Sequence, residues 1–226
     1  CLKQAIAAGI SNVLLLPAPS PSSTNGFATV LEMVEFVVAT FGKDALTIAV
    51  CGYLRGTRGE HGHYSKDAEA TSAQIKAGAT IVLTTPVWDV NHLVQYLTDC
   101  RVPMDGNLNK LATIQPAVMP LHALPSRAEF DRLCRALGWT APSGLVKELE
   151  KADKTGESGF KALGSSTFKS VLSELKSRCS KPGVGVPHII TMNSYAALEA
   201  MADAGFAIGP LPAAPTNTNA PPPPPP

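Results

Sequence analysis

Short apolar runs alternate along the chain with stretches whose apolar residues recur every three or four positions. The first run, Asn12 to Leu16, lies between Gly9 and the proline-rich segment that starts at Pro17. This pattern is typical of a buried parallel strand followed by a rigid loop. In the next stretch the apolar residues have helical spacing: Val30, Met33, Val34, Val37 and Phe41. The stretch stops at Gly42, which is free to adopt the positive φ of a helix end, so we predict a strand, a loop and a helix.

The same unit repeats along the sequence. We predict further strands at residues 46–51, 80–84, 111–118 and 187–191. We predict further helices at residues 67–76, 90–98, 144–151, 168–179 and 195–204, and one that the capping pair Ser126 and Glu129 opens. The Gly/Ser-rich segment 155–166 is predicted to be an irregular connection. Five strands, each followed by a helix, indicate an α/β fold with a parallel sheet, either an open doubly wound sheet or part of a (β/α)8 barrel.

The composition excludes several classes of protein. The 226 residues carry a net charge of +1, which argues against a nucleic-acid partner. No apolar run approaches the roughly 18 residues that a membrane-spanning helix needs, so we expect no direct membrane span. Five widely separated cysteines predict neither a disulfide framework nor a zinc ribbon, but reduced thiols in an intracellular compartment. Position 1 is Cys rather than Met, so a targeting signal would not be visible.

Prolines are concentrated at the end of the chain. Nine of the 20 lie between Pro210 and Pro226, and the last six are consecutive. We therefore predict one folded domain at residues 1–209 and an extended, proline-rich tail at residues 210–226. A proline run adopts polyproline II and is normally either disordered or docked on an aromatic groove. We expect this tail to be docked on a neighbouring protein.

Two candidate sites lie in the glycine-rich segment 52–62 after the second predicted strand. Arg55 and Arg58 lie among its glycines and form a possible anion site, although the segment matches no known phosphate-binding spacing, and a loop that contacts a partner is the alternative. His61 and His63 would need a third ligand to hold a metal, so we predict no metal site. Cys51 would act as a nucleophile only beside a base, and a buried apolar role is the alternative.

Several short motifs, taken in order, resemble the methylenetetrahydrofolate reductase family. They are Ala77-Gly78-Ala79 before a strand that ends at Thr84, the pair Trp88-Asp89, the turn Val118-Met119-Pro120, and the segment from His188 to Asn193. The resemblance runs from Leu2 to about Gly205. It implies a (β/α)8 barrel that binds FAD at the C-terminal ends of its strands and reduces a folate one-carbon adduct with a nicotinamide nucleotide. It also places Cys1 just ahead of the fourth strand, so we expect a partial barrel of strands four to eight.

The sequence departs from that family where the cofactor and the substrate are held. Pro17-Ala18-Pro19 replaces a charged motif at the end of the fourth strand, and two of its three residues lack a backbone N–H. Tyr53 and Asp67 are retained, whereas Thr85 stands in place of the substrate-binding glutamine. Other positions that contact the cofactor fall on Ala70, Ala73 and Gln74, and the last strand retains Thr191 and Asn193. The family's catalytic glutamate belongs to the first strand, which this sequence does not contain. We therefore predict no catalytic residue and no bound cofactor, with Tyr53 and Asp67 as the vestige of the site.

These departures lead to two functional hypotheses. The first is a non-catalytic accessory subunit of a large assembly, such as a mitochondrial respiratory-chain complex, with other protein subunits as partners. The alternative is a divergent FAD-dependent methylenetetrahydrofolate reductase whose first strands lie outside this sequence. The first hypothesis predicts a mitochondrial location, and a cytoplasmic one is the alternative.

Overall fold

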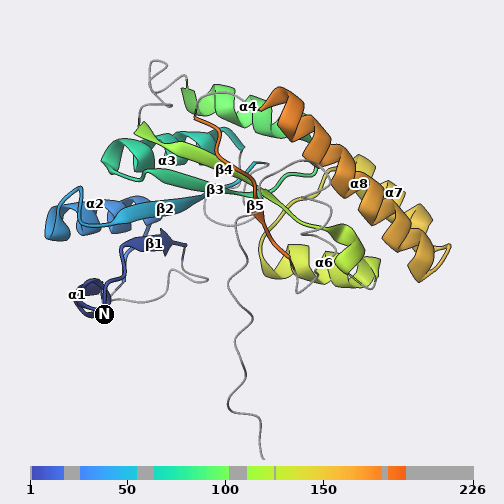
Figure 1. Ribbon diagram of the computed structural model, residues 1–226, viewed down its shortest axis with the longest axis horizontal. Coiled ribbons are helices and arrows are strands. Elements are labelled where there is room, and N and C mark those ends of the chain that lie inside the picture. Colours follow the sequence, from blue (N-terminus) through green and yellow to red (C-terminus); the bar gives the residue numbers. More distant parts are fainter. Residues whose placement is uncertain are drawn as a thin grey trace, which may run out of the picture.

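The computed structural model describes residues 2–17, 26–54, 64–101, 111–124, 126–179 and 183–191. Five parallel strands form one sheet: β1 (Asn12–Leu15), β2 (Thr47–Gly52), β3 (Ile81–Pro86), β4 (Thr113–Val118) and β5 (His188–Ile189). Their order in the sheet, β1-β2-β3-β4-β5, is their order in the sequence. A doubly wound sheet reverses its order at a switch point, and this one does not. The sequential order confirms a partial barrel, seen edge-on in Figure 1.

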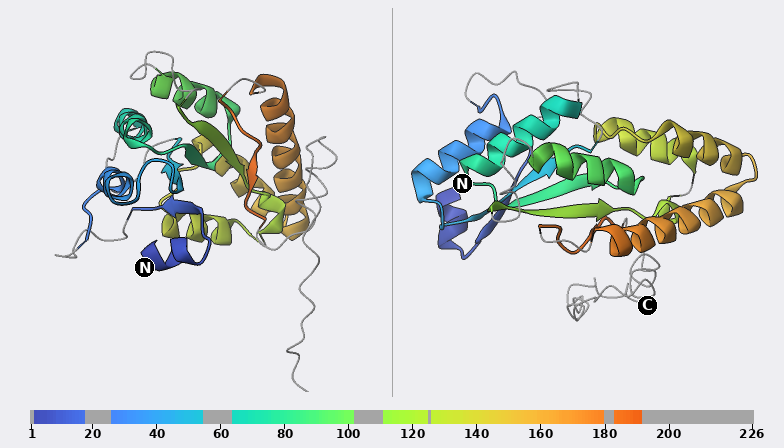
Figure 2. Two further views of the ribbon diagram at one scale, coloured as in Figure 1. Left: turned by 60° about the vertical axis from the view of Figure 1, so that its left-hand side comes forward. Right: turned by 90° about the horizontal axis from the view of Figure 1, so that it is seen from above.

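Helices cover the outer face of this half-barrel. In the left-hand view of Figure 2, α2 (Val30–Phe41), α3 (Tyr64–Ala77), α4 (Val90–Arg101) and α8 (Glu157–Arg178) form an arc around the strands. Alternate residues of β2 and β3 point into this layer and are buried, and those between them are half-buried. The outer layer forms one hydrophobic core, whose most buried members include Val34, Ile48, Val50, Val82, Leu93, Ile114 and Leu172.

Capping residues fix the ends of the helices as the sequence indicates. The Thr29 hydroxyl accepts a hydrogen bond from the Glu32 amide at the start of α2, and Gly42 ends that helix with a φ of 88°. At the start of α6 (Arg127–Ala136), the Ser126 hydroxyl accepts a bond from the Glu129 amide. These bonds satisfy amides that have no partner inside the helix, so both boundaries follow from local chemistry.

The prediction of an irregular segment at residues 155–166 was wrong. Residues 157–166 form the first half of α8, and Thr155 and Gly156 belong to the tight turn that follows α7 (Ser143–Asp153). A Cβ at Gly164 would lie 2.5 Å from the backbone nitrogen of His122, in the short 3-10 helix η2 (Leu121–Ala123). Gly164 therefore allows the backbones of α8 and η2 to approach closely, and the small residues of this segment belong to a helix and not to a loop.

A second hydrophobic cluster lies beside the first, under α6, α7 and the start of α8. Its buried members are Met119, Leu121, Leu124, Phe130, Leu145, Leu149 and Phe160. Cys134 lies at its edge and is only partly buried, and Leu137 is exposed. Because α8 continues into the first core through Phe168 and Leu172, one helix joins the two clusters.

Other differences from the predicted elements are local. An additional helix, α1 (Leu2–Ala7), precedes β1, α3 begins three residues earlier than predicted, and β5 is only two residues long. The predicted helix at residues 195–204 and the tail at residues 210–226 lie outside the described residues. Within the described ranges, no helix is both long enough and apolar enough to span a membrane.

Candidate functional site

The C-terminal ends of the strands meet at one edge of the half-barrel, because all the strands run in the same direction. Pro17 follows β1, Tyr53 follows β2, Val87 follows β3 and Met119 follows β4. Barrel enzymes build their active sites from the loops at this end. We therefore take this edge as the candidate site.

Two predicted site residues, Tyr53 and Asp67, both act on the Cys51 side chain. Tyr53 forms a hydrogen bond with the Cys51 side chain, and Asp67, in the first turn of α3, lies close enough for its charge to act on the thiol. Burial raises the pKa of Cys51 from 9.0 to about 11; the Tyr53 hydrogen bond opposes this rise and the charge of Asp67 adds to it. The thiol is therefore protonated at neutral pH, which favours the packing role of Cys51 over the nucleophilic one.

Asp67 is the most deeply placed charge at this edge. Only 3% of its surface is exposed, whereas charged residues are rarely so buried. Gln74, further along α3, is also buried, and its Oε1 atom has no hydrogen-bond partner among the described residues. An unsatisfied buried acceptor is unusual, and the only role predicted for Gln74 was a lost cofactor contact.

The threonines at the end of β3 hold the neighbouring strands together. The Thr85 hydroxyl, at the position of the family's substrate-binding glutamine, accepts a hydrogen bond from the Leu54 amide over 3.2 Å. The Thr84 hydroxyl donates to the Thr85 carbonyl and accepts from the Ala117 amide, at 2.8 and 2.9 Å. The ladder between β3 and β4 is irregular from Leu83 to Pro86, so the Thr84 side chain supplies an acceptor where the regular pattern is interrupted. Both hydroxyls therefore hold neighbouring backbone segments in place, at Leu54 and at Ala117.

Much of the predicted site lies outside the described residues. These positions are Ala18, Pro19, Arg55, Arg58, His61, His63 and Asn193. The anion site at Arg55 and Arg58 therefore stays a prediction. Within the described part, no group of three His, Cys, Asp or Glu residues is placed to hold a metal ion.

The three described histidines have different surroundings. His92 pairs with Asp89 at the start of α4, with 3.8 Å between its Nδ1 atom and the carboxylate. This pair was not predicted from the sequence. The His122 ring packs edge-on against Phe168, with 5.9 Å between the ring centroids, and His188 is exposed.

The described residues fit the implied FAD poorly. Tyr53 and Asp67 keep their polar groups, but Ala70 and Ala73 offer no hydrogen bond, and the Thr85 hydroxyl is already bonded to Leu54. Pro17 has no backbone N–H to offer a phosphate. This edge offers polar groups at Tyr53 and Asp67, but it supplies only part of what the resemblance implies for a flavin.

Comparison with known proteins identifies relatives over most of the chain. The family model described as methylenetetrahydrofolate reductase matches residues 1–204. The "Probable methylenetetrahydrofolate reductase (NADH)" of Oryza sativa subsp. japonica is 26% identical over 204 residues, which cover 82% of this chain and 31% of the relative. "Methylenetetrahydrofolate reductase (NADH) 1" of Zea mays is 25% identical with the same coverage. The chain thus spans about a third of the length of these curated relatives.

A solved structure has a similar fold. It is described as an "Uncharacterized protein from Clostridium thermocellum" that "binds two copies of 5-methyl-5,6,7,8-tetrahydrofolic acid". The TM-score is 0.56 at 15% sequence identity, and the match covers 86% of this chain and 62% of that one. At this identity the similarity supports the fold, here the partial barrel.

Proposed function

Because the chain belongs to the methylenetetrahydrofolate reductase family, we propose that it acts in folate one-carbon metabolism by binding a reduced folate at the C-terminal ends of its strands. The observation that carries the proposal is the convergence of Tyr53 and Asp67 beside Cys51. These two residues come from different elements, and both belong to the family pattern. Their hydroxyl and carboxylate are groups that hydrogen-bond the N–H-rich edge of a pterin.

The names of similar proteins support the same substrate class. The plant relatives are named as reductases of methylenetetrahydrofolate, and the Clostridium thermocellum protein is described as binding a methylated tetrahydrofolate. The finer activity, reduction of the folate adduct by a nicotinamide nucleotide through FAD, belongs to the same proposal. It requires groups beyond the described residues, because this edge alone fits a flavin poorly.

A binding experiment tests the proposal directly. Titration of the full chain with 5-methyltetrahydrofolate, followed by calorimetry, should give saturable binding. Asp67→Asn and Tyr53→Phe should each weaken it about tenfold, since the first removes a negative charge and the second a hydroxyl group (about 1.4 kcal/mol per tenfold change). The matched control is Asp44→Asn, because Asp44 is exposed just ahead of β2, at the opposite end of the same strand. Absence of binding at millimolar folate, or equal loss in the control, would contradict the proposal.

The finer reductase activity has a separate readout. Flavin fluorescence released when the native protein is denatured, together with folate-dependent oxidation of NADH or NADPH, would support it. Folate binding without either signal would restrict the function to binding.

An assembly role is the second candidate, and one observation favours it. Leu14 and Leu16, on the inner side of β1, are 45% and 54% exposed. Within the described residues, β1 and β5 each pair on one side only, which leaves two sheet edges open. A partner that covers these surfaces would account for both features. If the chain alone proves to be a monomer that melts cooperatively, this role fails; neither the fold nor the relatives support a respiratory-chain complex or a mitochondrial location.

A further inference from the structure

A cleft lies beside the loop after β3, and neither Tyr53 nor Asp67 lines it. It has a volume of about 530 Å³ and opens between the loop after β3 and the helices α7 and α8. This is the size of a site for a small molecule. None of the residues that line it belongs to β2 or α3, so it is independent of the proposed folate site.

Apolar side chains form part of its lining. Trp88 is held by an edge-to-face contact with Phe130, with 5.5 Å between ring centroids and 74° between the planes. Leu145 of α7 and Val171 of α8 also line the cleft and are both buried. A tryptophan fixed by packing and left partly exposed offers a rigid surface to an apolar body or to a cation.

The charged groups that line the cleft are all acidic: Asp89, Glu148 and Glu174. Asp89 accepts a hydrogen bond from the Asn91 amide at 2.8 Å and pairs with His92. Glu148 forms no ion pair within the described ranges.

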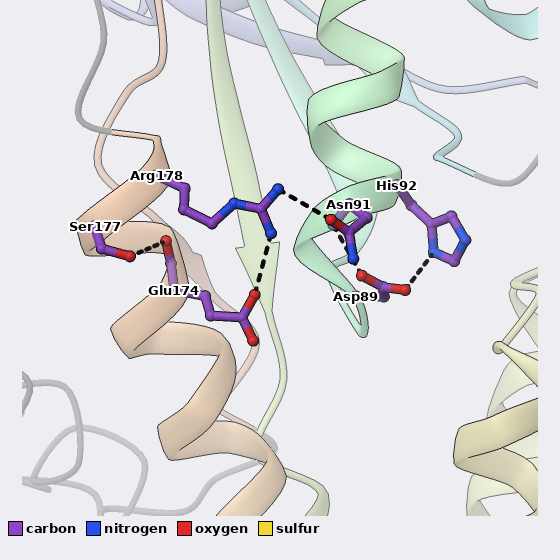
Figure 3. Close-up of polar contacts among 6 residues, drawn as sticks. All are labelled: Asp89, Asn91, His92, Glu174, Ser177 and Arg178. Carbon is purple, nitrogen blue, oxygen red and sulfur yellow. Dashed lines mark hydrogen bonds and ion pairs between the residues drawn. The ribbon is translucent and has the colours of Figure 1, made fainter.

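One arginine at the rim offsets part of this charge. Arg178 lies 3.4 Å from Glu174 and donates a hydrogen bond to the Asn91 side chain at 2.9 Å, which ties the end of α8 to the start of α4 (Figure 3). Arg178 neutralises Glu174 and Asp89 pairs with His92, so Glu148 is the acidic group of the lining that has no ion pair among the described residues. The arginine therefore fixes one end of the cleft and leaves the other end electronegative.

From this lining we propose that the cleft binds a small organic cation, an ammonium group joined to an apolar ring or chain. The ammonium lies against Glu148 and Asp89, and the apolar part packs on Trp88 and Val171. Charge complementarity selects the cation, and the apolar walls reject small inorganic ions, which gain nothing from them.

Trp88 provides the readout of the test. The chain has two tryptophans, so the variant Trp139→Phe leaves Trp88 as the single emitter. In that background, phenethylamine should change the emission saturably, and the neutral analogue 2-phenylethanol should bind at least tenfold more weakly. Raising the salt concentration from about 20 to 300 mM should weaken the amine several-fold, because the carboxylates are partly exposed.

Charge-removing variants complete the test. Glu148→Gln should weaken the binding of phenethylamine three- to tenfold and leave the binding of 2-phenylethanol unchanged. The matched control is Glu157→Gln, since Glu157 lies on α8, pairs with Lys161 and does not line the cleft. Circular dichroism confirms that each variant is folded.

Three outcomes would overturn the proposal. They are no response to the amine at 20 mM, equal binding of the alcohol, and equal loss in Glu148→Gln and Glu157→Gln. Much tighter binding of an oligolysine peptide than of phenethylamine would also overturn it, because the cleft would then be a surface for a basic chain.

Discussion

The two faces of the sheet are built from the same strands but are packed differently. On the outer face Ile48 of β2 is 1% exposed under the helices, while on the inner face Ile81 of β3 is only half-buried. The inner face also carries Cys51 and ends at Tyr53, whereas Asp67 belongs to α3 in the well-packed outer layer. The difference indicates that stability comes mainly from the outer layer, and the proposed folate site uses residues from both sides.

The largest expected effect compares one substitution on the two faces. Ile48→Ala should lower the free energy of unfolding by about 2–5 kcal/mol, because it leaves a cavity under the helices. Ile81→Ala should cost about 1 kcal/mol, since its side chain already contacts solvent. Urea denaturation of both variants measures the difference. Equal losses would show that the two faces are packed alike.

The next effect tests how tightly α4 packs on the outer face. A Cβ at Gly52 would lie 2.6 Å from the Tyr96 hydroxyl and 2.7 Å from a Val82 methyl group. Gly52→Ala should therefore destabilise the protein by about 1–3 kcal/mol, measured as a shift of the urea midpoint. Gly144→Ala is the control, because nothing lies within 4 Å of that Cβ and alanine favours a helix. A tolerated Gly52→Ala would mean that the outer layer can relax.

The thiols of the two faces allow a comparison by pH. Burial raises the pKa of both Cys51, on the inner face, and Cys100, a buried residue of α4, from 9.0 to about 11. Since the folded pKa is the higher one, the stabilisation is complete below pH 9 and is lost as the pH rises through 11. Each thiol should contribute a loss of about 1.4 kcal/mol per pH unit in that window.

Other groups also titrate at high pH, so the measurement is a difference. The unfolding free energy of the wild type is followed from pH 8.5 to 11 and compared with that of the variants Cys51→Ala and Cys100→Ala. Each variant should show a shallower decline than the wild type. If the unfolding free energies of a variant and the wild type declined in parallel, that thiol would be exposed to solvent in the folded protein.

The smallest expected effect compares two of the four tyrosines, Tyr96 and Tyr53. Tyr96 is fully buried, and its hydroxyl donates a hydrogen bond to the Thr71 hydroxyl over 2.8 Å, so Tyr96→Phe should cost about 0.5–1.5 kcal/mol. Compared with Tyr96→Phe, Tyr53→Phe should lower the free energy of unfolding less and weaken folate binding more, because Tyr53 lies at the C-terminal edge of the sheet. Denaturation and calorimetry on both variants test this exchange. A larger stability loss for Tyr53→Phe would reverse the assignment of the faces.

Repetition made much of the fold predictable from the sequence. The strands β1 to β4 and the helices α2, α4 and α6 follow from apolar spacing and from caps such as Ser126. Helix α8 was missed in its first half, because glycine and serine are poor local evidence for a helix and Gly164 is explained only by a contact with His122. In the site, Tyr53 and Asp67 could be found by resemblance. The use of Thr84 and Thr85 as backbone acceptors could not, since it depends on the interrupted ladder beside Pro86.

Helix α8 couples the unfolding of the two hydrophobic clusters. Its 22 residues extend over roughly 33 Å, with Phe160 in one cluster and Leu172 in the other. Because the helix is continuous, it cannot separate from one cluster without disturbing its packing in the other, so the two clusters should unfold together. Amide hydrogens near Phe160 and Leu172 should then exchange with solvent at one common rate, as parts of a single cooperative unit.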